Sequence, residues 1–250
     1  MIKTLFPAGV TTLEATPAMW EAPLLPEEEA CLSPRAVAKR RREFAAGRAC
    51  ARAALARLGV VDFPLRSGPD RTPIWPPDIV GSLSHCPDFC GVAVTRRGAI
   101  AGLGLDVERA RPLQDRVAAM ICTEAERDRL TRLPDLPAPL WAMVLFCAKE
   151  GVYKCFYPLA RMHLDFHDVE IDLDPPAGSF TARVIRARWG AGETAGAAAG
   201  GAGAGVAAEP PVRVMHGRFA WNDAHVFAGV TLTAAELATP RGGGSARPGS

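Results

Sequence analysis

Two carboxylates separated by one residue are the first candidates for chemistry in this chain. Asp106 and Glu108 end the stretch 101–108, which reads AGLGLDVE. Side chains alternate along a β-strand, so both carboxylates would lie on one face, with Cα atoms roughly 7 Å apart. Two carboxylates at that spacing repel each other unless a cation lies between them, and Mg²⁺ prefers oxygen ligands of this kind. The pattern indicates a divalent-cation site, and the alternative is a strand with a solvated acidic face.

The next candidates follow an uncharged stretch at 137–148, which reads PAPLWAMVLFCA. Lys149, Glu150 and Lys154 come directly after it. Glu150 and Lys154 are four positions apart and would share one face of a helix that Pro158 ends. A helix that is apolar all round is buried, so charged groups at its C-terminal end need partners. This favours a functional pair over the alternative, an ion pair on the surface.

Arginines on either side of Phe44 are candidates for binding an anion. Arg41 lies three residues before Phe44 and Arg48 four residues after it, so both would flank the buried stripe of a helix. Arg40 is rotated about 100° from Arg41 and is expected to point into water. A guanidinium group at the edge of a core needs an anionic partner, and phosphate matches its planar geometry. The alternative is that both arginines bury only their stems and reach solvent.

A serine and a histidine end another predicted strand, 80–85, which reads VGSLSH. Ser84 and His85 would point to opposite faces, and the G-x-S-x-G motif of many serine hydrolases is absent, so nucleophilic catalysis is not expected. His85 is predicted instead to donate to a bound anion. Cys86 and Cys90, or His163 and His167, could form a metal pair, but structural zinc needs four ligands and neither pair has a matching second pair.

The elements that would position these residues follow from local signals. Ser33 and Pro34 predict the start of the arginine-bearing helix, and Gly59 predicts its end. The buried stripe of this helix, read at helical spacing, contains Val37, Phe44, Ala51, Leu55 and Leu58. The strand 89–95 is predicted to pair with the strand 101–108 through a turn at 96–98.

Glycines on the carboxylate-bearing strand have an implication of their own. Gly102 and Gly104 share the face of Asp106 and Glu108. A strand without side chains at these positions leaves room, so something bulky is expected to lie against this face.

The rest of the chain predicts an antiparallel sheet. Its candidate strands cover 169–173, 180–187, 212–221 and 225–232, with a turn at 222–223. An insert at 190–208 consists mostly of glycine and alanine and cannot pack a core. The tail at 236–250 is expected to be disordered.

Composition restricts the class of protein. The chain has 250 residues, a formal net charge of +2 and seven cysteines without a C-x-x-C pair. This charge balance does not favour a nucleic-acid partner, and no apolar run reaches the ~20 residues needed to cross a bilayer. The first residues lack the apolar core of a signal peptide, and the cysteines are expected to be reduced thiols. A soluble cytoplasmic protein is predicted.

Taken in order, these motifs closely resemble those of the 4′-phosphopantetheinyl transferases, in particular the surfactin-type and enterobactin synthase component D-type enzymes. The resemblance covers roughly residues 37–158. The stretches that carry it are 38–44 (AKRRREF) with 47–52 (GRACAR), Trp75 with Pro76, 81–85 (GSLSH), 104–108 (GLDVE) and 145–154 (LFCAKEGVYK).

The resemblance implies an α+β fold of two similar α+β halves related by a pseudo-twofold axis, with coenzyme A in the cleft between them. The first half would cover residues 1–97 and the second residues 98–235. Family members transfer the phosphopantetheine arm of coenzyme A to a serine of a carrier protein and release 3′,5′-ADP. The resemblance also implies a cytoplasmic monomer that acts on apo acyl, peptidyl or aryl carrier domains, with no nucleic-acid or membrane partner.

The resemblance assigns roles to individual residues. Asp106, Glu108 and Glu150 would hold Mg²⁺ against the diphosphate. Glu150, directly or through a metal-bound water, is the expected general base, with Lys154 as the second catalytic residue. The residues implied to contact coenzyme A are Arg41, Arg48, Arg71, Ser84, His85, Asp106, Lys149 and Lys154. Among them, Arg48 and His85 would bind the 3′-phosphate, Arg71 would lie near the adenosine, and the two lysines would reach the diphosphate. The glycines before Asp106 would make room for coenzyme A.

Three alternative functions fit the sequence less well. A non-catalytic coenzyme A-binding protein would not need three carboxylates together with Lys154. A nucleic-acid-binding protein could use the arginine-rich helix, but the aromatic residues that usually alternate with basic ones are absent. A metal-dependent phosphohydrolase would explain the carboxylates but not Arg41 and Arg48 on a separate helix.

Overall fold

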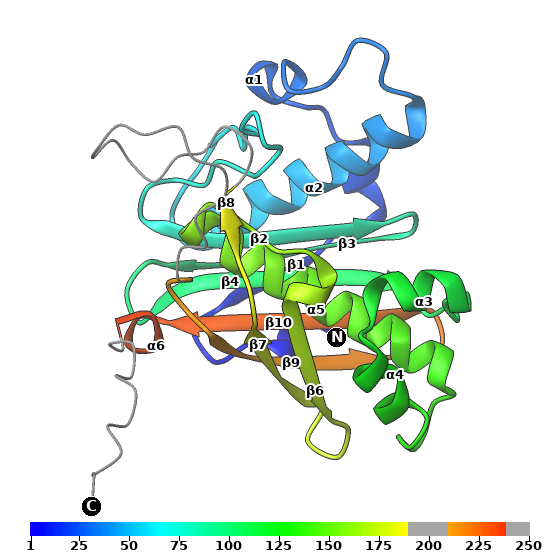
Figure 1. Cartoon of the computed structure of the whole chain (residues 1–250). Helices are drawn as coiled ribbons and strands as arrows, with labels where there is room; N and C mark the ends of the chain where they lie inside the picture. The colour runs from blue at the N-terminus through cyan, green and yellow to red at the C-terminus, as the bar shows by residue number, and fades with distance from the viewer. Residues whose placement is uncertain (190–209, 239–250) are drawn as a thin grey trace, which may run out of the picture.

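The structure, a computed structural model, describes residues 1–189 and 210–238, so the insert predicted at 190–208 lies outside it (Figure 1). The described strands form a three-stranded, a five-stranded and a two-stranded antiparallel sheet. The strands are β1 (Thr11–Glu14), β2 (Ile79–Cys86), β3 (Phe89–Arg96), β4 (Ile100–Arg109), β5 (Met162–His163), β6 (Val169–Asp174), β7 (Ser179–Val184), β8 (Arg188–Trp189), β9 (Val214–Trp221) and β10 (His225–Thr233). The α-helices are α1 (Pro26–Glu29), α2 (Ala38–Ala56), α3 (Asp115–Ile121), α4 (Glu124–Leu130), α5 (Ala138–Ala160) and α6 (Ala234–Ala238). Three short 3₁₀ helices are η1 (Ile2–Leu5), η2 (Pro17–Glu21) and η3 (Phe166–Asp168).

The three-stranded sheet, in the order β1–β3–β2, packs against helix α2. Ala46, Cys50 and Leu55 of α2 belong to the same buried cluster as residues of β3. The helix begins at Ala38, later than predicted, because residues 33–36 form a turn closed by a backbone hydrogen bond of 2.9 Å. Val37, which was predicted to be buried, precedes the helix and is 67% exposed.

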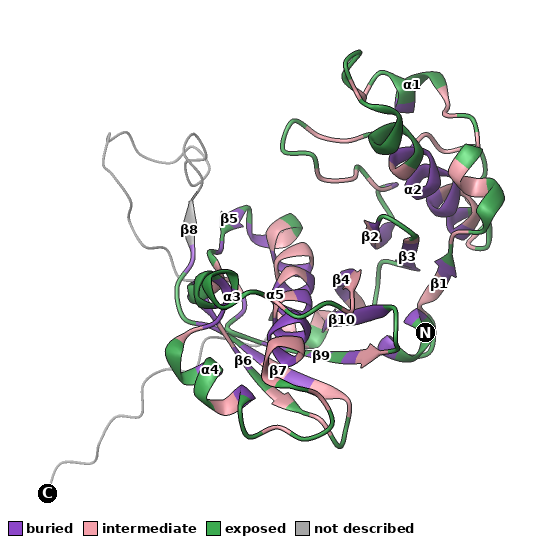
Figure 2. Cartoon of the chain, turned by 90° about the vertical axis from the view of Figure 1, so that its right-hand side faces the viewer, coloured by how far each residue is buried: buried purple, intermediate pink, exposed green. Residues whose placement is uncertain are grey.

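The five-stranded sheet, in the order β4–β10–β9–β7–β6, packs against helix α5. The buried sides of α2 and α5 face the strands in Figure 2. Helix α5 crosses β4 so closely that a Cβ atom on Gly104 would lie 1.9 Å from the carbonyl oxygen of Gly151, and one on Gly102 would lie 2.9 Å from the sulfur of Cys155. The bulky group that these glycines accommodate is therefore helix α5. The expectation that they make room for coenzyme A was therefore wrong for Gly104, whereas Gly102 also borders a cavity of about 1190 Å³.

Helix α5 continues past Pro158, which was predicted to end it, and reaches Ala160. Proline lacks an N–H group and so removes one helical hydrogen bond, which has little effect on a helix this close to its end. Arg161 ends the helix in the left-handed conformation, with φ 54°, and its N–H donates to the carbonyl oxygen of Tyr157.

The two larger sheets meet where β2 lies beside β4 (Figure 1). The hairpin predicted between 89–95 and 101–108 does not form, because β3 pairs with β1 and β2 while β4 pairs with β10. Serine hydroxyls of β2 bind the facing edge of β4. The N–H of Leu105 donates to Ser82 Oγ (2.9 Å), and the N–H of Val107 donates to Ser84 Oγ (3.2 Å). We call this junction of β2 and β4 the seam.

The antiparallel strands predicted after residue 168 are confirmed as β6, β7, β9 and β10. Helix α6 covers residues 234–238 and thus includes the start of the predicted tail. The reason is a local cap, in which the N–H of Thr233 donates to Glu236 and the N–H of Glu236 donates to Thr233 Oγ1. Residues 239–250 lie outside the described part. Within that part, none of the helices combines the length and the apolar character that crossing a membrane requires.

Candidate functional site

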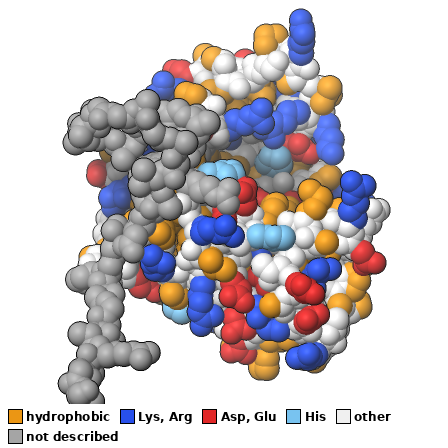
Figure 3. Space-filling model, viewed as in Figure 1, with side chains coloured by type: hydrophobic (Ala, Val, Ile, Leu, Met, Phe, Trp, Pro, Cys, Tyr) orange, Lys and Arg blue, Asp and Glu red, His pale blue; other side chains and the backbone are white. Residues whose placement is uncertain are grey.

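A cavity of about 1190 Å³ lies at the seam. The cavity is lined by one face of α2, the loop 67–77, β2, β4 and the C-terminal part of α5. Figure 3 shows a hollow between the upper and lower parts of the molecule, with Lys and Arg side chains gathered along its upper rim. The predicted site residues that line the cavity are Arg48, Arg71, Ser84, His85, Asp106, Glu108, Glu150 and Lys154. Arg41 and Lys149 are not among the lining residues.

Asp106 is the most deeply buried carboxylate of the cavity, with 3% of the residue exposed. Its Oδ1 accepts hydrogen bonds from Lys154 Nζ at 2.6 Å and from Ser84 Oγ at 2.9 Å. Its Oδ2 is buried and has no hydrogen-bond partner, and the thiol of the nearby Cys147 donates to the carbonyl oxygen of Val226 (3.7 Å). A buried carboxylate oxygen without a donor costs free energy, which a bound cation could recover.

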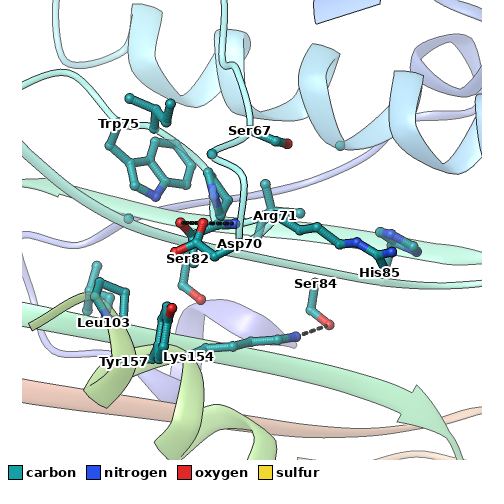
Figure 4. Close-up of a pocket in the computed structure, with 18 of the residues that line it drawn as sticks. Ser67, Asp70, Arg71, Trp75, Ser82, Ser84, His85, Leu103, Lys154 and Tyr157 are labelled. Atoms are coloured by element: carbon teal, nitrogen blue, oxygen red, sulfur yellow. Dashed lines mark hydrogen bonds between the residues drawn. The ribbon is translucent and has the colours of Figure 1, made fainter. Parts of the chain in front are cut away.

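Ser84 connects β2, β4 and α5 through one hydroxyl. Besides donating to Asp106, its Oγ accepts from Lys154 Nζ (3.1 Å) and from the N–H of Val107 (3.2 Å). A hydroxyl has one donor and two acceptor positions, so these three contacts use all of them. Figure 4 shows Lys154 reaching from α5 to Ser84, with His85 next along the strand. In this arrangement Ser84 holds Asp106 and Lys154 in place.

The other two carboxylates of the cavity, Glu108 and Glu150, are partly buried. Burial and the charge of Asp106 raise the pKa of Glu108 to about 7, and Glu150 adds to this shift. Burial and Asp106 also raise the pKa of Glu150. Burial opposes the charge of Lys154, but Asp106 outweighs it, so the pKa of Lys154 is raised and its ammonium stays charged. The three carboxylates together therefore carry more negative charge than the single ammonium group of Lys154 can neutralise.

This carboxylate set fits a hard divalent cation in chemistry, because all of its donor atoms are carboxylate oxygens. The three side chains do not converge on one point. A different group of potential metal ligands does converge. Among residues 1–189 and 210–238, the potential ligand atoms of Cys86, Asp88 and His225 all lie within 4.8 Å of one another.

The Cys86–Asp88–His225 trio has a structural explanation. Oδ1 of Asp88 accepts from Arg109 Nε and lies near His225 Nε2, both at 3.1 Å. A guanidinium group thus already neutralises this carboxylate. The contacts join the turn between β2 and β3 to β4 and β10, across the boundary between the two larger sheets.

Arg48 lies in the cavity wall formed by α2, with 4% of the residue exposed. Its guanidinium carbon lies 3.8 Å from the centre of the Phe44 ring, and its Nη2 donates to Ser67 Oγ at 2.7 Å. Its Nε is buried without an acceptor. Burial lowers the pKa of Arg48 to about 10, so the group is still charged at neutral pH. Within the described residues, the two buried side-chain polar atoms without a partner are Arg48 Nε and Asp106 Oδ2, and both residues line this cavity.

Arg40 occupies the place predicted for Arg41. Arg40 lines the cavity and its Nη1 lies 3.2 Å from His85 Nε2. Arg41 is turned away and its Nη1 donates to both carboxylate oxygens of Glu29, at 2.5 and 2.7 Å. Arg40, Phe44 and Arg48 are four positions apart and share one face of α2, and this spacing was the signal that could have identified Arg40. The prediction that Arg41 lies in the site was wrong, and Arg40, although exposed to solvent as expected, also lines the cavity.

Lys149 lies outside the cavity, with 3% of the residue exposed. Its ammonium donates to Glu126 Oε2 at 2.8 Å and to the carbonyl oxygens of Ile121 (3.0 Å) and Phe166 (2.7 Å). These contacts use all three ammonium protons, so Lys149 cannot reach a diphosphate. It follows Ala148 on the side of α5 that faces α4, about 100° from Glu150, which explains why its neighbour lines the cavity and Lys149 does not.

The loop 67–77 covers one end of the cavity. A Cβ atom on Gly81 would lie 2.6 Å from the Trp75 ring, so this glycine lets the ring pack onto β2. Asp70 accepts from Arg161 Nη1 at 2.8 Å, which links the loop to the end of α5. Arg71 is exposed and lines the cavity from this loop with a left-handed backbone, φ 66°.

Comparison with known proteins gives matches along most of the chain. Residues 27–95 match the family model described as the 4′-phosphopantetheinyl transferase N-terminal domain, and residues 102–199 match that of the 4′-phosphopantetheinyl transferase superfamily. The chain is 42% identical over 214 residues to 4′-phosphopantetheinyl transferase Svp of Streptomyces mobaraensis, which covers 77% of this chain and 85% of that protein. It is 42% identical over 159 residues to 4′-phosphopantetheinyl transferase PptT of Mycobacterium tuberculosis, covering 63% and 69% of the two chains. It is also 35% identical over 120 residues to enterobactin synthase component D of Salmonella typhi, covering 47% and 49%.

Proposed function

Since the chain belongs to the 4′-phosphopantetheinyl transferase family, we propose that its cavity is where the phosphopantetheine arm of coenzyme A is transferred to a serine of an apo carrier protein. The matches to known proteins confirm the family that was predicted from the motifs. One observation supports this location above the others. Arg48 and Asp106, residues of opposite charge, each have a buried polar atom without a partner, and both line the same cavity. A ligand that carries phosphates together with a cation would satisfy both atoms.

We propose that Asp106, Glu108 and Glu150 hold Mg²⁺. Their oxygen-only donor set, the unpartnered Oδ2 of Asp106 and the raised pKa of Glu108 support this assignment. When bound, Mg²⁺ would neutralise charge on the diphosphate oxygens. Lys154 would supply a second positive charge beside the same carboxylates.

The basic wall of the cavity is proposed to bind the phosphates and adenosine of coenzyme A. Arg48 and His85, together with Arg40, would contact the 3′-phosphate, because these side chains lie on facing surfaces of α2 and β2. Arg71 would lie near the adenosine from the loop 67–77. Arg41 and Lys149 have no part in this assignment because other residues of the fold already pair with them.

The transfer itself requires one bond to form and one to break. The serine Oγ of the carrier attacks the β-phosphorus of coenzyme A, and the oxygen that leaves stays with 3′,5′-ADP. We assign Glu150 as the group that accepts the serine proton, directly or through a water molecule, since it lines the cavity beside Asp106. Lys154 remains charged and would stabilise the negative charge on the phosphate oxygens.

A mass-shift assay tests the proposed function. The protein is incubated with coenzyme A, MgCl₂ and apo carrier proteins from fatty-acid, polyketide and nonribosomal peptide synthesis. We expect at least one carrier to gain the mass of a single phosphopantetheine, and the gain to disappear when its acceptor serine is replaced by alanine. No gain on any carrier would overturn the proposal, and coenzyme A binding without a gain would favour the non-catalytic alternative.

We further propose that the protein acts as a monomer in the cytoplasm. Both walls of the cavity come from one chain, and all seven cysteines are free thiols, as suits a reducing compartment. Light scattering on the purified chain should give the mass of one copy, and a dimer would contradict the monomer.

We also propose that residues 1–97 and 98–235 form halves related by a pseudo-twofold axis, since each packs one long helix, α2 or α5, against an antiparallel sheet.

A further inference from the structure

His85 lies between a cation and an anion that both come from α2. Its Nε2 lies 3.2 Å from Arg40 Nη1, and its Nδ1 lies 3.9 Å from Glu43 Oε2. The side chains of His85 and Glu43 are only 24% and 12% exposed, so this contact is largely shielded from water. Glu43 was not identified from the sequence, yet it is an acidic residue in a cavity wall that otherwise carries Arg40 and Arg48.

The hydrogen-bonding pattern determines where the proton of His85 lies. Arginine can only donate, so the Nε2 that faces Arg40 is the acceptor. A neutral imidazole then carries its proton on Nδ1, the nitrogen that faces Glu43. The contact with Arg40 thus favours one tautomer, and the negative charge of Glu43 on the Nδ1 side favours the same one.

The groups that surround the ring have opposing effects on its charge. Burial is the main cause that lowers the pKa of His85, and Arg40, Lys154 and Arg48 lower it further, whereas Glu43 raises it. The ring is therefore neutral near neutral pH in the absence of a ligand. A phosphate dianion placed among these cations would reverse the balance, because it favours a positive charge on the imidazole.

We propose that Glu43 is a positioning residue, whose carboxylate attracts the Nδ1 side of His85 and acts as its counter-ion when Nε2 takes up one proton from solvent as the 3′-phosphate of coenzyme A binds. This inference rests on the proposed contact between His85 and that phosphate. In the bound state, the Nε2–H of His85 and the guanidinium of Arg40 both donate to phosphate oxygens. No other bond changes, and the proton comes from the buffer.

Calorimetry can count this proton. Coenzyme A and 3′-dephospho-coenzyme A are titrated into the full-length protein with MgCl₂ at pH 8, in buffers that differ in ionisation enthalpy. A phosphate monoester is already a dianion at this pH, because its second pKa is about 6. We expect binding of coenzyme A to take up close to one proton more than binding of the dephospho form. Any protons exchanged at the carboxylates are the same for both ligands, so they cancel when the two proton counts are subtracted. Absence of any coenzyme A binding would overturn the proposed function, whereas binding with equal proton counts would overturn this inference alone.

Glu43→Gln tests the role of the carboxylate, since it keeps the shape of the side chain and removes the charge. We expect the extra proton uptake at pH 8 to fall to about half and the KM for coenzyme A at pH 8 to rise about tenfold, the factor that one pKa unit represents. The KM for 3′-dephospho-coenzyme A and kcat should stay unchanged, and the difference from wild type should narrow at pH 6, where protons are abundant.

Two further variants complete the test. Glu43→Asp retains the charge and should restore part of the proton uptake. Lys39→Ala removes a second ion-pair partner of Glu43. The side chain of Lys39 is 69% exposed, so this variant should behave as wild type. If Glu43→Gln raised KM equally for both ligands at every pH, Glu43 would have only a structural role and the inference would be wrong.

Discussion

At the residue scale, Asp106 determines how the acidic side of the cavity is arranged. One of its oxygens is fully engaged by Lys154 and Ser84, while the other is buried without a donor. The same carboxylate raises the pKa values of Glu108, Glu150 and Lys154. A change at this one position therefore alters the charge of the whole group.

Asp106→Asn and Glu150→Gln should each reduce kcat on the order of a hundredfold or more, because each removes a negative charge that the proposed cation needs. The rate of the mass shift on a carrier protein measures the effect. Circular dichroism and thermal unfolding establish that the variants remain folded. A variant with normal turnover would remove that residue from the site.

Arg48→Ala should raise the KM for coenzyme A by about tenfold or more, because a charge-assisted hydrogen bond to phosphate contributes about 1.5–3 kcal/mol. The KM for 3′-dephospho-coenzyme A should change much less. Arg41→Ala is the matched control on the same helix, since Arg41 pairs with Glu29 outside the cavity. Equal increases for both substrates would exclude a contact between Arg48 and the 3′-phosphate.

At the element scale, the close contact of α5 and β4 places Glu150 and Lys154 over Asp106. Gly104→Ala should force the helix away from the strand, since the new Cβ would overlap the backbone of Gly151. We expect a loss of roughly 3 kcal/mol or more in the free energy of unfolding, measured by urea denaturation. Gly151→Ala is the control, because its Cβ would lie 3.5 Å from the nearest atom, Val230 Cγ2, and a helix interior prefers alanine. Equal losses in both variants would contradict this account of the contact.

The parts of the site that follow from local periodicity were predictable from the sequence. The strand ending in Asp106 and Glu108 alternates strictly, and the spacing of Glu150 and Lys154 puts them on one helix face, and all four residues line the cavity. Periodicity also showed that the helix is apolar all round, but it could not show which charged residue faces which neighbour.

The errors concern residues whose partners are distant in the sequence. Arg41 pairs with Glu29, twelve positions away, and Lys149 with Glu126, twenty-three positions away. Nothing local predicts either pairing. The glycines of β4 were correctly expected to face something bulky, but only the tertiary packing shows that this is another part of the chain.

At the scale of the whole molecule, the acidic side of the cavity couples stability to pH and to the cation. Glu108 has an ordinary pKa of 4.5 and a folded pKa of about 7. A raised folded pKa means that the stabilisation is present below pH 4.5 and is lost as pH rises through 7. In the absence of a cation, ionisation of this carboxylate therefore destabilises the fold at alkaline pH.

Mg²⁺ should consequently raise the melting temperature more at pH 8 than at pH 5.5. For a difference of about 2 kcal/mol, the extra gain is roughly 4–8 °C. The lowered pKa of His85 changes stability in the opposite sense, but it does so with and without Mg²⁺, so the difference between the two scans isolates the carboxylates. Glu108→Gln should flatten the dependence, and an equal gain at both pH values in the wild type would refute a metal-bound Glu108.

The hydrogen bonds of the two serine hydroxyls at the seam provide a way to detect whether a ligand occupies the cavity. The amide hydrogens of Leu105 and Val107 are held by Ser82 and Ser84 rather than by a neighbouring backbone. Only Ser84 also contacts Lys154 and Asp106, so a ligand that draws these groups toward itself should change the hydrogen–deuterium exchange rate of the Val107 amide and leave that of Leu105 as a reference. Two amides in the middle of one strand, two residues apart, would thus distinguish an occupied cavity from an empty one without any label.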